Sequence, residues 1–416
     1  MSRLAALLTG RILPTLTWLS GNTYLSAVRA GMVAVVPLTI VGGVFMIVSY
    51  LPVAGWEGIV APYRQLLQVP VAATFGILAV VVCFAIAHAL ASRLDQDPLV
   101  SAIVAVVIFL MLQLNLEDMI VVTDGLGSQG LFTAILVALV SVRVQKLLDD
   151  RNLVIRLPPS VPPIVYQSFV SLSPLFLLVV GFWTLRFVLG VDVNATVQAA
   201  FEPLVFALNT LPGILVYAFL VTMLWSVGIN GDNAMDAIVA PIFLQYLAAN
   251  VTAVSQGQPI PYITAYGFFT AFVNVGGTGA TLGLALVLWR SRDAGYRQVS
   301  RLSLPTQVFQ INEPIFFGLP IVLNPVFMIP YVLNALLLTA GTYLLMHWNV
   351  IGRPFVNVPW TTPPIVGHYL VTGGDPRAAV WGAVSILLAT LVYFPFARAA
   401  ERQRQAGGAV RQSAAL

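Results

Sequence analysis

The feature that most constrains this 416-residue chain is a series of apolar stretches, each close to the length of a membrane-spanning helix. A helix needs about twenty consecutive apolar residues to cross a bilayer. Ten stretches approach that length, at residues 24–50, 71–91, 98–114, 129–148, 165–189, 211–230, 233–249, 263–289, 321–346 and 376–397. Because 59% of the residues are hydrophobic and only 9% are charged, the sequence predicts an all-α polytopic membrane protein.

Basic residues are distributed unevenly between the loops that join these stretches. Ten spans put both termini on one side of the membrane, and that side carries 15 of the 20 Lys and Arg residues, against Arg64 and Arg353 opposite. The basic side comprises 1–23, 92–97, 149–164 with the adjoining Arg143 and Lys146, 290–301 and 398–416. Since basic loops stay in the cytoplasm, we predict a multi-pass protein of the cytoplasmic membrane with both termini inside.

Four segments fit neither a span nor an ordinary loop. Residues 1–23 and 191–210 mix apolar with charged or amide side chains, which is typical of amphipathic helices that lie in the membrane interface. Residues 303–320 and 354–366 contain too many prolines for a regular crossing helix. We expect these two to be re-entrant hairpins that enter from opposite faces, because irregular backbone at membrane depth must be covered by protein or line a cavity.

One carboxylate, Glu313, stands among apolar residues in the first of these Pro-rich segments. An ionisable group at membrane depth is costly and usually faces a cavity or a pathway. Together with the broken backbone, Glu313 indicates a substrate site in a transporter, and Asn312 beside it adds a donor and an acceptor suited to hydroxyl groups. The alternative is a Glu at the edge of the bilayer that caps a helix.

The segment 225–233 combines polar groups with Gly228 and Gly231, which interrupt a predicted span. If a helix restarts there, Asp232 and Asp236 share one of its faces because they are four residues apart. Either they contribute to a polar site, or Asp232 caps the N-terminus of that helix.

The segment 272–281 contains Gly276, Gly277 and Gly279 around Thr278. Glycines let a backbone approach a ligand, and they equally let two helices pack closely. Close packing is the simpler interpretation, and a ligand role for Thr278 and Gly279 is the alternative.

Several classes of function lack a signal. The single cysteine, Cys83, stands in an apolar stretch, so no disulfide framework and no cysteine-based metal site is expected. The three histidines are scattered singly at positions 88, 347 and 368, and no nucleic-acid or metal-binding motif is present in the sequence. We therefore predict neither a metal nor another cofactor.

The run Asn-Glu-Pro-Ile-Phe-Phe-Gly-Leu-Pro-Ile-Val-Leu-Asn-Pro at 312–325 resembles the signature of the sugar phosphotransferase system. The resemblance is to the membrane IIC component of the lactose/cellobiose/diacetylchitobiose family, and it extends from about residue 20 to 400. Further segments that carry it are 24–32, 157–163, 276–282, 358–364 and 372–375. It implies a homodimer with ten spans and two re-entrant hairpins, in which disaccharide translocation is coupled to phosphorylation.

The resemblance also implies a division of the chain and a set of site residues. Residues 1–250 would form the dimer, 251–400 would hold both hairpins and much of the sugar site, and 401–416 would be a cytoplasmic tail, all within one IIC domain. Glu313 is the implied catalytic residue. The implied sugar-binding residues are Trp225, Asn230, Asn233, Asn312, Glu313 and Trp360, with His88, Asp232, Thr278 and Gly279 as further candidates. Trp360 could instead be an aromatic residue of the membrane interface.

One position departs from the family pattern. The family usually reads Gly-Ile-His-Gly where this chain reads Gly-Ile-Asn-Gly at 228–231, and Asn230 can donate and accept hydrogen bonds but cannot titrate near neutral pH. His88 could compensate, although a packed, satisfied histidine is the simpler interpretation.

The partners that the resemblance implies are a disaccharide, membrane lipid, and separate IIB and IIA proteins, because Cys83 lies in a span and cannot be the phosphorylated cysteine. The chain would then be the membrane component of a phosphohistidine–sugar phosphotransferase. The basic loop at 290–301 could receive an anionic carrier, or it could serve only to fix the orientation. Two alternatives stay open: a sugar facilitator of the same fold without phosphorylation, for which Asn230 is the main support, and a sugar-binding membrane sensor.

Overall fold

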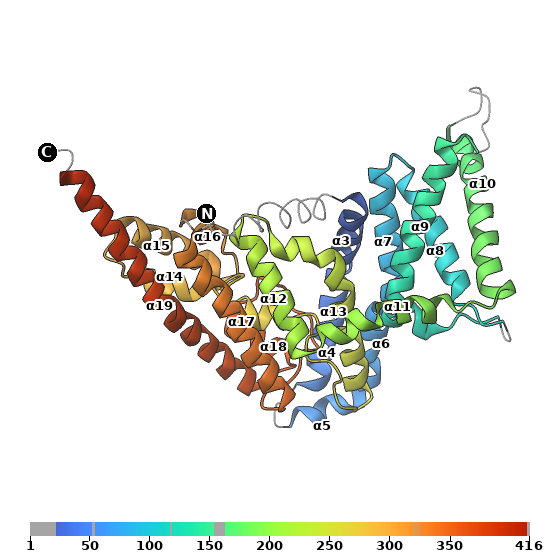
Figure 1. Cartoon of the computed structure of the whole chain (residues 1–416). Helices are drawn as coiled ribbons and strands as arrows, with labels where there is room; N and C mark the ends of the chain where they lie inside the picture. The colour runs from blue at the N-terminus through green and yellow to red at the C-terminus, as the bar shows by residue number, and fades with distance from the viewer. Residues whose placement is uncertain are drawn as a thin grey trace. The chain divides into compact units, whose positions relative to one another are not determined.

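The computed structural model describes residues 22–51, 55–116, 119–153, 163–319, 321–322 and 324–413, and of these the side chains of Asp124, 163–171 and 406–413 are not described. The described part is helical (Figure 1), and its one β feature is an isolated bridge between Leu114 and Val121. The predicted all-α class is confirmed. The predicted interfacial helix at 1–23 and the motif at 157–163 lie, except at their last residues, outside the described residues.

The elements follow one another along the chain with connections of unequal length, such as the long one at 348–363. In order they are α3 (Thr23–Ala34), α4 (Val36–Tyr50), α5 (Trp56–Val60), η2 (Ala61–Tyr63), α6 (Arg64–Phe75), α7 (Leu78–Arg93), α8 (Pro98–Leu112), η3 (Thr123–Leu126), η4 (Ser128–Gly130), α9 (Leu131–Asp150), α10 (Pro163–Trp183), η5 (Thr184–Val188), α11 (Val193–Leu208), α12 (Leu211–Ser226), α13 (Gly231–Ser255), η6 (Phe268–Val273), α14 (Leu282–Leu288), α15 (Ala294–Val308), α16 (Glu313–Gly318), α17 (Pro325–His347), α18 (Pro364–Val371) and α19 (Pro376–Ser413). Of these, η5 and η6 are π-helical turns.

Six helices in the described part are long and apolar enough to cross a membrane: Thr23–Tyr50, Trp56–Arg93, Ser128–Asp150, Gly231–Ser255, Pro325–His347 and Pro376–Gln405. Each covers all or most of one predicted stretch. The predicted spans at 98–114 and 211–230 are the shorter apolar helices α8 and α12. The predicted span at 165–189 ends in a bend of 85° into α11. The residues of α11 therefore leave the direction of the preceding helix, as expected of an amphipathic segment.

The predicted span at 263–289 is not one helix. It consists of η6, an irregular segment at 274–281, and α14. Gly276, Gly277 and Gly279 have φ angles of 77°, 102° and 76° in this segment. Such left-handed conformations are readily available to glycine but cannot continue a right-handed helix, so the apolar pattern alone overstated the regularity of this stretch.

The described chain divides into two compact units. Unit 1 comprises residues 1–42, 69–205 and 235–248. Within it α7 packs against α3, α8 and α9, and small residues bring the helices close. A methyl group on Gly31 of α3 would lie 2.2 Å from a side-chain atom of Ile86 in α7. A buried hydrogen bond of 2.9 Å from the Ser101 hydroxyl to Gln145 joins α8 and α9.

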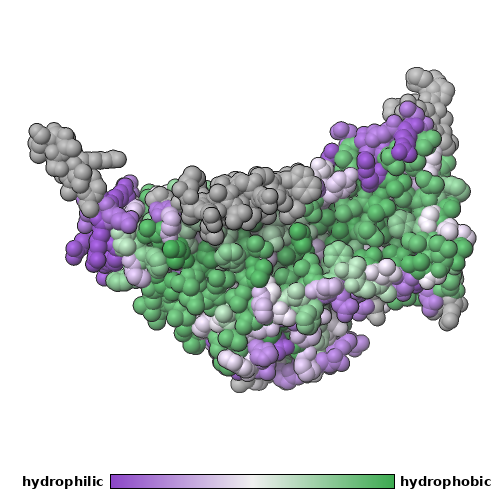
Figure 2. Space-filling view, in the orientation of Figure 1, coloured by the Kyte–Doolittle hydropathy of each residue, from purple (hydrophilic) through white to green (hydrophobic). Residues whose placement is uncertain are grey.

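Unit 2 comprises residues 43–68, 206–234 and 249–416. Helix α17 packs against α12 and α19, while α14 packs against α15 and α19. The surface of α19 is apolar along most of its length and hydrophilic toward its C-terminal end (Figure 2). Its exposed residues change accordingly, from Val380, Leu387 and Leu391 to Arg402 and Arg404. This division is typical of a helix that passes from lipid to water.

The two Pro-rich segments of unit 2 contain no long helix. The first consists of the end of α15, which includes Pro305, a break at 309–312, and the short α16. The second has neither helix nor strand from 352 to 359, and a turn and α18 follow it. Both are broken where the sequence predicts hairpins, and they carry Glu313 and Trp360.

Candidate functional site

Glu313 is the first residue of α16 and follows the break in the chain. A Glu and a Pro in the first turn suit a helix N-terminus, because the dipole favours an acid and Pro lacks an N–H. The side chain of Asn312 makes no capping hydrogen bond. Glu313 is exposed, and its carboxylate has no hydrogen-bond or ion-pair partner among the described residues. It is therefore available to a ligand.

A chain of hydrogen bonds links the residue before Glu313 to the end of α12. The Asn312 side-chain amide donates to the carbonyl of Thr278 at 2.9 Å. The Thr278 hydroxyl donates to Oδ2 of Asp232 at 2.7 Å, and the indole N–H of Trp225 donates to the same oxygen at 2.8 Å. Four predicted site residues from separate segments of unit 2 are thus joined.

Gln310, which the sequence analysis did not single out, fixes the same region from within the break. Its Oε1 accepts from the N–H groups of Gly276 and Gly277 at 2.7 and 3.3 Å, and its Nε2 donates to the carbonyl of Thr270 at 3.0 Å. Because 6% of Gln310 is exposed, its amide has to find partners inside the protein. A glutamine two residues before Asn312, in an apolar segment, was the signal that could have identified it.

The glycines of segment 276–279 allow close packing. A methyl group on Gly277 would lie 2.5 Å from Cβ of Asn312, and one on Gly279 would lie 2.2 Å from the ring of Tyr331. The carbonyl of Gly279 accepts a hydrogen bond of 2.7 Å from the Tyr393 hydroxyl. Only a residue without a side chain fits at these two positions, in line with the simpler interpretation of the sequence.

Asn230 caps α13. Its backbone is extended, and its side-chain oxygen accepts from the Asn233 N–H at 2.9 Å. Since Asn is among the best N-cap residues, the capping role considered for Asp232 belongs to Asn230 instead. Asp232 lies in the first turn and turns its carboxylate toward Trp225 and Thr278, while Asn233 is exposed.

The two predicted site tryptophans differ in exposure. Trp225 is 6% exposed and lies edge-to-face against Phe316, with 5.1 Å between ring centroids. Trp360 is 56% exposed in the turn before α18, and no hydrogen bond or ring contact joins it to the cluster within the described residues. Trp360 therefore presents an open aromatic face, whereas Trp225 forms part of a packed wall.

His88 belongs to unit 1, in α7, so it is not part of the cluster that unit 2 forms. It is exposed and stacks on Phe84 at 6.1 Å between ring centroids. The residues that the structure describes contain no group of three His, Cys, Asp or Glu side chains suited to a metal ion.

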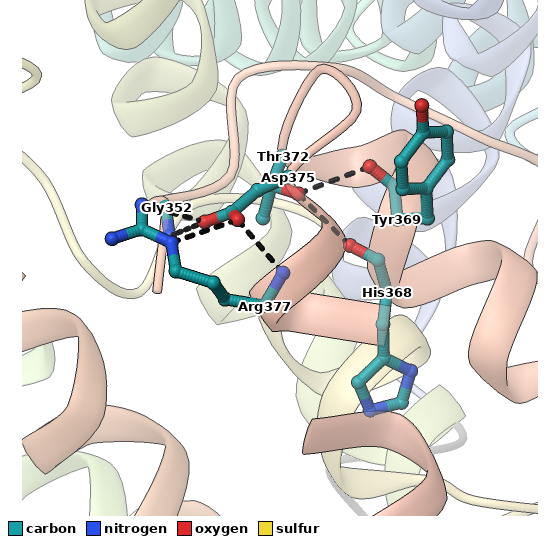
Figure 3. Close-up of polar contacts among 6 residues, drawn as sticks. All are labelled: Gly352, His368, Tyr369, Thr372, Asp375 and Arg377. Atoms are coloured by element: carbon teal, nitrogen blue, oxygen red, sulfur yellow. Dashed lines mark hydrogen bonds and ion pairs between the residues drawn. The ribbon is translucent and has the colours of Figure 1, made fainter. Parts of the chain in front are cut away.

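Side-chain hydrogen bonds of Thr372 and Asp375 stabilise the junction of α18 and α19, next to the second broken segment (Figure 3). The Thr372 hydroxyl donates to the carbonyls of His368 and Tyr369, both at 3.0 Å. Asp375 accepts from the Gly352 N–H at 2.7 Å and from the Arg377 guanidinium at 3.0 Å. Burial raises the pKa of the Asp375 carboxyl, but these hydrogen bonds outweigh burial, and the pKa lies below its ordinary value.

A helical membrane protein with a polar cluster built on broken, glycine-rich backbone has the features of a membrane transport protein. The family described as Phosphotransferase system, EIIC matches residues 29–335, and the chain belongs to this family. The resemblance seen in the sequence is thereby confirmed.

Known relatives cover almost the whole chain. It is 35% identical over 429 residues to the putative permease IIC component YwbA of Bacillus subtilis, and the aligned region covers 97% of each chain. It is 32% identical over 437 residues to the cellobiose-specific EIIC component of Geobacillus stearothermophilus, covering 98% and 96%. The crystal structure of ChbC, the IIC component of an N,N'-diacetylchitobiose-specific phosphotransferase system, is similar with a TM-score of 0.91 and 31% identity, covering 96% and 99%.

Proposed function

We propose that this chain is a phosphotransferase-system permease that binds a disaccharide, moves it across the cytoplasmic membrane and presents it to a separate phosphorylated IIB protein. Two relatives carry the names of disaccharides, cellobiose and N,N'-diacetylchitobiose. The observation that carries the proposal is the Glu313 carboxylate, which is exposed and has no partner among the described residues, on a break that Asn312 and Gln310 secure.

In the proposed reaction a sugar hydroxyl oxygen attacks the phosphorus of a phosphocysteine on IIB. The new O–P bond forms as the S–P bond breaks, the cysteine sulfur leaves as thiolate, and Glu313 takes the hydroxyl proton. Phosphoryl transfer depends mainly on positioning and charge, so a weak base in contact with the hydroxyl is sufficient. Cys83 is fully buried in α7, which supports a phosphoryl donor on another protein.

The remaining candidates take supporting roles in this proposal. Asn233, which is exposed, offers hydrogen bonds to sugar hydroxyls, and Asn312 offers its side-chain oxygen, because its nitrogen already donates to Thr278. Trp360 offers an open ring for the apolar face of a sugar. Asn230 holds the start of α13, and Trp225 forms a wall of the site. We assign no sugar contact to His88, and we assign to Thr278 and Gly279 the packing described above.

The cytoplasmic end of unit 2 is the proposed docking surface for IIB. Exposed basic residues gather there on the segment around α15 and at the end of α19. They are Arg290, Arg292, Arg301, Arg402 and Arg404. This concentration of charge would attract an anionic phosphoprotein. We further propose a homodimer formed through residues 1–250.

Orientation can be tested at the basic segment. With both termini cytoplasmic, a Gln298→Cys variant in a Cys83→Ser background should resist an impermeant thiol reagent in intact cells and react in opened membranes. Gln298 is exposed in α15, whereas the nearby Ser300 is buried and donates to the Ala285 carbonyl. Ready labelling in intact cells would contradict this orientation and place the segment outside the cell.

A facilitator without phosphorylation is the second candidate function, favoured by Asn230 at the position where the family usually has a titratable histidine. Membrane vesicles that contain the full chain separate the two. Supplied with phosphorylated IIB and labelled cellobiose or N,N'-diacetylchitobiose, they should accumulate sugar phosphate. Uptake of free sugar with no sugar phosphate would establish the facilitator and contradict the permease proposal.

A further inference from the structure

Asp232 is a carboxylate whose two hydrogen bonds both end on one oxygen. Oδ2 accepts from the Trp225 indole N–H at 2.8 Å and from the Thr278 hydroxyl at 2.7 Å. A charge among apolar residues is costly unless it is hydrogen-bonded. The first turn of α13 lowers this cost further, because the N-terminal end of a helix favours negative charge.

The bonds reach beyond Asp232 to the segment that carries Glu313. Thr278 and Asn312 are 6% and 5% exposed, and the Thr278 carbonyl accepts from the Asn312 side-chain amide at 2.9 Å. Hydrogen bonds shielded from water in this way restrict their groups to one arrangement. Trp225, in turn, packs against Phe316 of α16 through its ring. Asp232 thus approaches α16 by two routes, one through Thr278 and one through Trp225.

We infer that Asp232 is a positioning residue, which holds Trp225 and the Asn312–Glu313 segment in the arrangement that receives the sugar. The expected effect on sugar binding rests on the proposed function, whereas the arrangement of the residues rests on the hydrogen bonds alone. The cap of α13 is supplied by Asn230, so helix capping does not account for Asp232. Its role is the acceptance of two hydrogen bonds, not the transfer of a proton.

This role makes the two smallest substitutions behave differently. Asp232→Asn keeps one oxygen that can accept both bonds, while it removes the charge and replaces the other oxygen with an NH2 group. Asp232→Ala removes the acceptor and leaves the Trp225 N–H and the Thr278 hydroxyl without it. Asp232→Ala should weaken sugar binding by ~10-fold or more, in line with the loss of hydrogen bonds to a charged group, while Asp232→Asn should stay within ~3-fold of the native protein.

A test that does not need sugar comes first. In the full chain, hydrogen–deuterium exchange should rise in segments 276–281 and 309–316 for Asp232→Ala and remain near native for Asp232→Asn. Asp150→Ala at the exposed end of α9 is the matched control, because the structure gives the Asp150 carboxylate a single pair, with Lys146 at 3.0 Å. Thr278→Val, which keeps the shape and removes the hydroxyl, should reproduce part of the change even if Asp232→Ala fails to fold.

The second measurement uses labelled cellobiose and N,N'-diacetylchitobiose as probes, with dissociation constants and the rate of phosphorylation of bound sugar measured separately. The loss in Asp232→Ala should fall mainly on affinity, and Thr278→Val should add nothing further in that background. Unchanged exchange in Asp232→Ala, or an Asp232→Asn variant as defective as Asp232→Ala, would overturn the inference. Failure of the native chain to bind either sugar would instead contradict the proposed function, and the exchange result would still stand or fall by itself.

Discussion

Apolar helices pack closely in both unit 1 and unit 2, but the backbone at the close contacts differs between the two units. In unit 1 the helices are continuous where they meet, and glycines such as Gly31 lie inside regular turns. In unit 2 the glycines at 276, 277 and 279 have left-handed backbone, and the chain leaves the helix there. Buried polar side chains differ correspondingly: Gln145 accepts from one hydroxyl, whereas Gln310 binds three backbone groups.

The difference indicates how a polar cluster forms inside an apolar protein. Broken backbone exposes N–H and C=O groups that must be paired, and the residues that pair them are brought to one place. Asn312 and Gln310 are such residues, and the side chains of Thr278 and Asp232 extend the same hydrogen-bonded cluster. Glu313 lies beside Asn312 without a partner in the described chain. The predictions below test whether function depends on unit 2 in the way that this contrast requires.

The largest effect is expected at Glu313. Glu313→Gln keeps the shape of the side chain and removes the base, so phosphorylation of sugar should fall by ~10²-fold or more while binding persists in part. Phosphate transfer from labelled IIB to sugar measures the loss. Glu202→Gln, at an exposed position of α11 in unit 1, should remain close to native. Native phosphorylation in the Glu313→Gln variant would remove Glu313 from the reaction.

Gln310 and Gln145 give a direct comparison of the two units. Gln310→Ala leaves two N–H groups and one carbonyl unpaired, and should lower the free energy of unfolding by about 2 kcal/mol. Gln145→Ala removes one hydroxyl partner, and Gln145 Nε2 has none among the described residues, so it should cost about 1 kcal/mol or less. Thermal unfolding in detergent measures both losses of stability. A loss in Gln145→Ala that equals or exceeds the loss in Gln310→Ala would contradict the difference between the two units.

The sequence was sufficient to identify the apolar helices and Glu313, because the hydropathy of a whole segment shows both an apolar helix and a charge that stands out within it. It did not identify Gln310, whose role depends on which N–H groups approach its amide after folding. The break at 274–281 was missed for a related reason. Its residues carry no charge and lie between apolar stretches, so hydropathy alone continues the span across them. The φ angles of the glycines reveal the irregular path. The position of His88 in the other unit likewise depends on the fold, not on local pattern.

A smaller effect is expected at Asn230, which caps α13. Asn230→Ala removes the cap of α13 and should cost ~1 kcal/mol of stability, with a loss of sugar affinity of about 0.5–1.5 kcal/mol. Asn230→Ser should restore the cap. Asn230→His loses the cap as well, and should add a pH dependence between about 5 and 8. Thermal unfolding and sugar binding across this pH range measure these changes, and full retention of stability in the Asn230→Ala variant would contradict the capping role.

The smallest effect is expected at Asp375, which accepts hydrogen bonds from Gly352 and Arg377. Because the folded pKa of this carboxyl lies below its ordinary value of 3.8, its hydrogen bonds stabilise the fold above that pH. The contribution is lost as the pH falls through the lower, folded pKa. Asp375→Asn should therefore lower stability by about 1 kcal/mol or less at pH 7 and make less difference in strong acid. An effect that grows as the pH falls would contradict this assignment.

The most direct test of the central claim is a structure of the full chain with cellobiose or N,N'-diacetylchitobiose bound. We predict that a sugar hydroxyl lies within hydrogen-bond distance of the Glu313 carboxylate, at about 2.6–3.2 Å, with Asn312 beside it and the Asp232–Thr278 bond intact. A sugar held among the continuous helices of unit 1, away from Glu313, would contradict the assignment of the site to the broken backbone of unit 2.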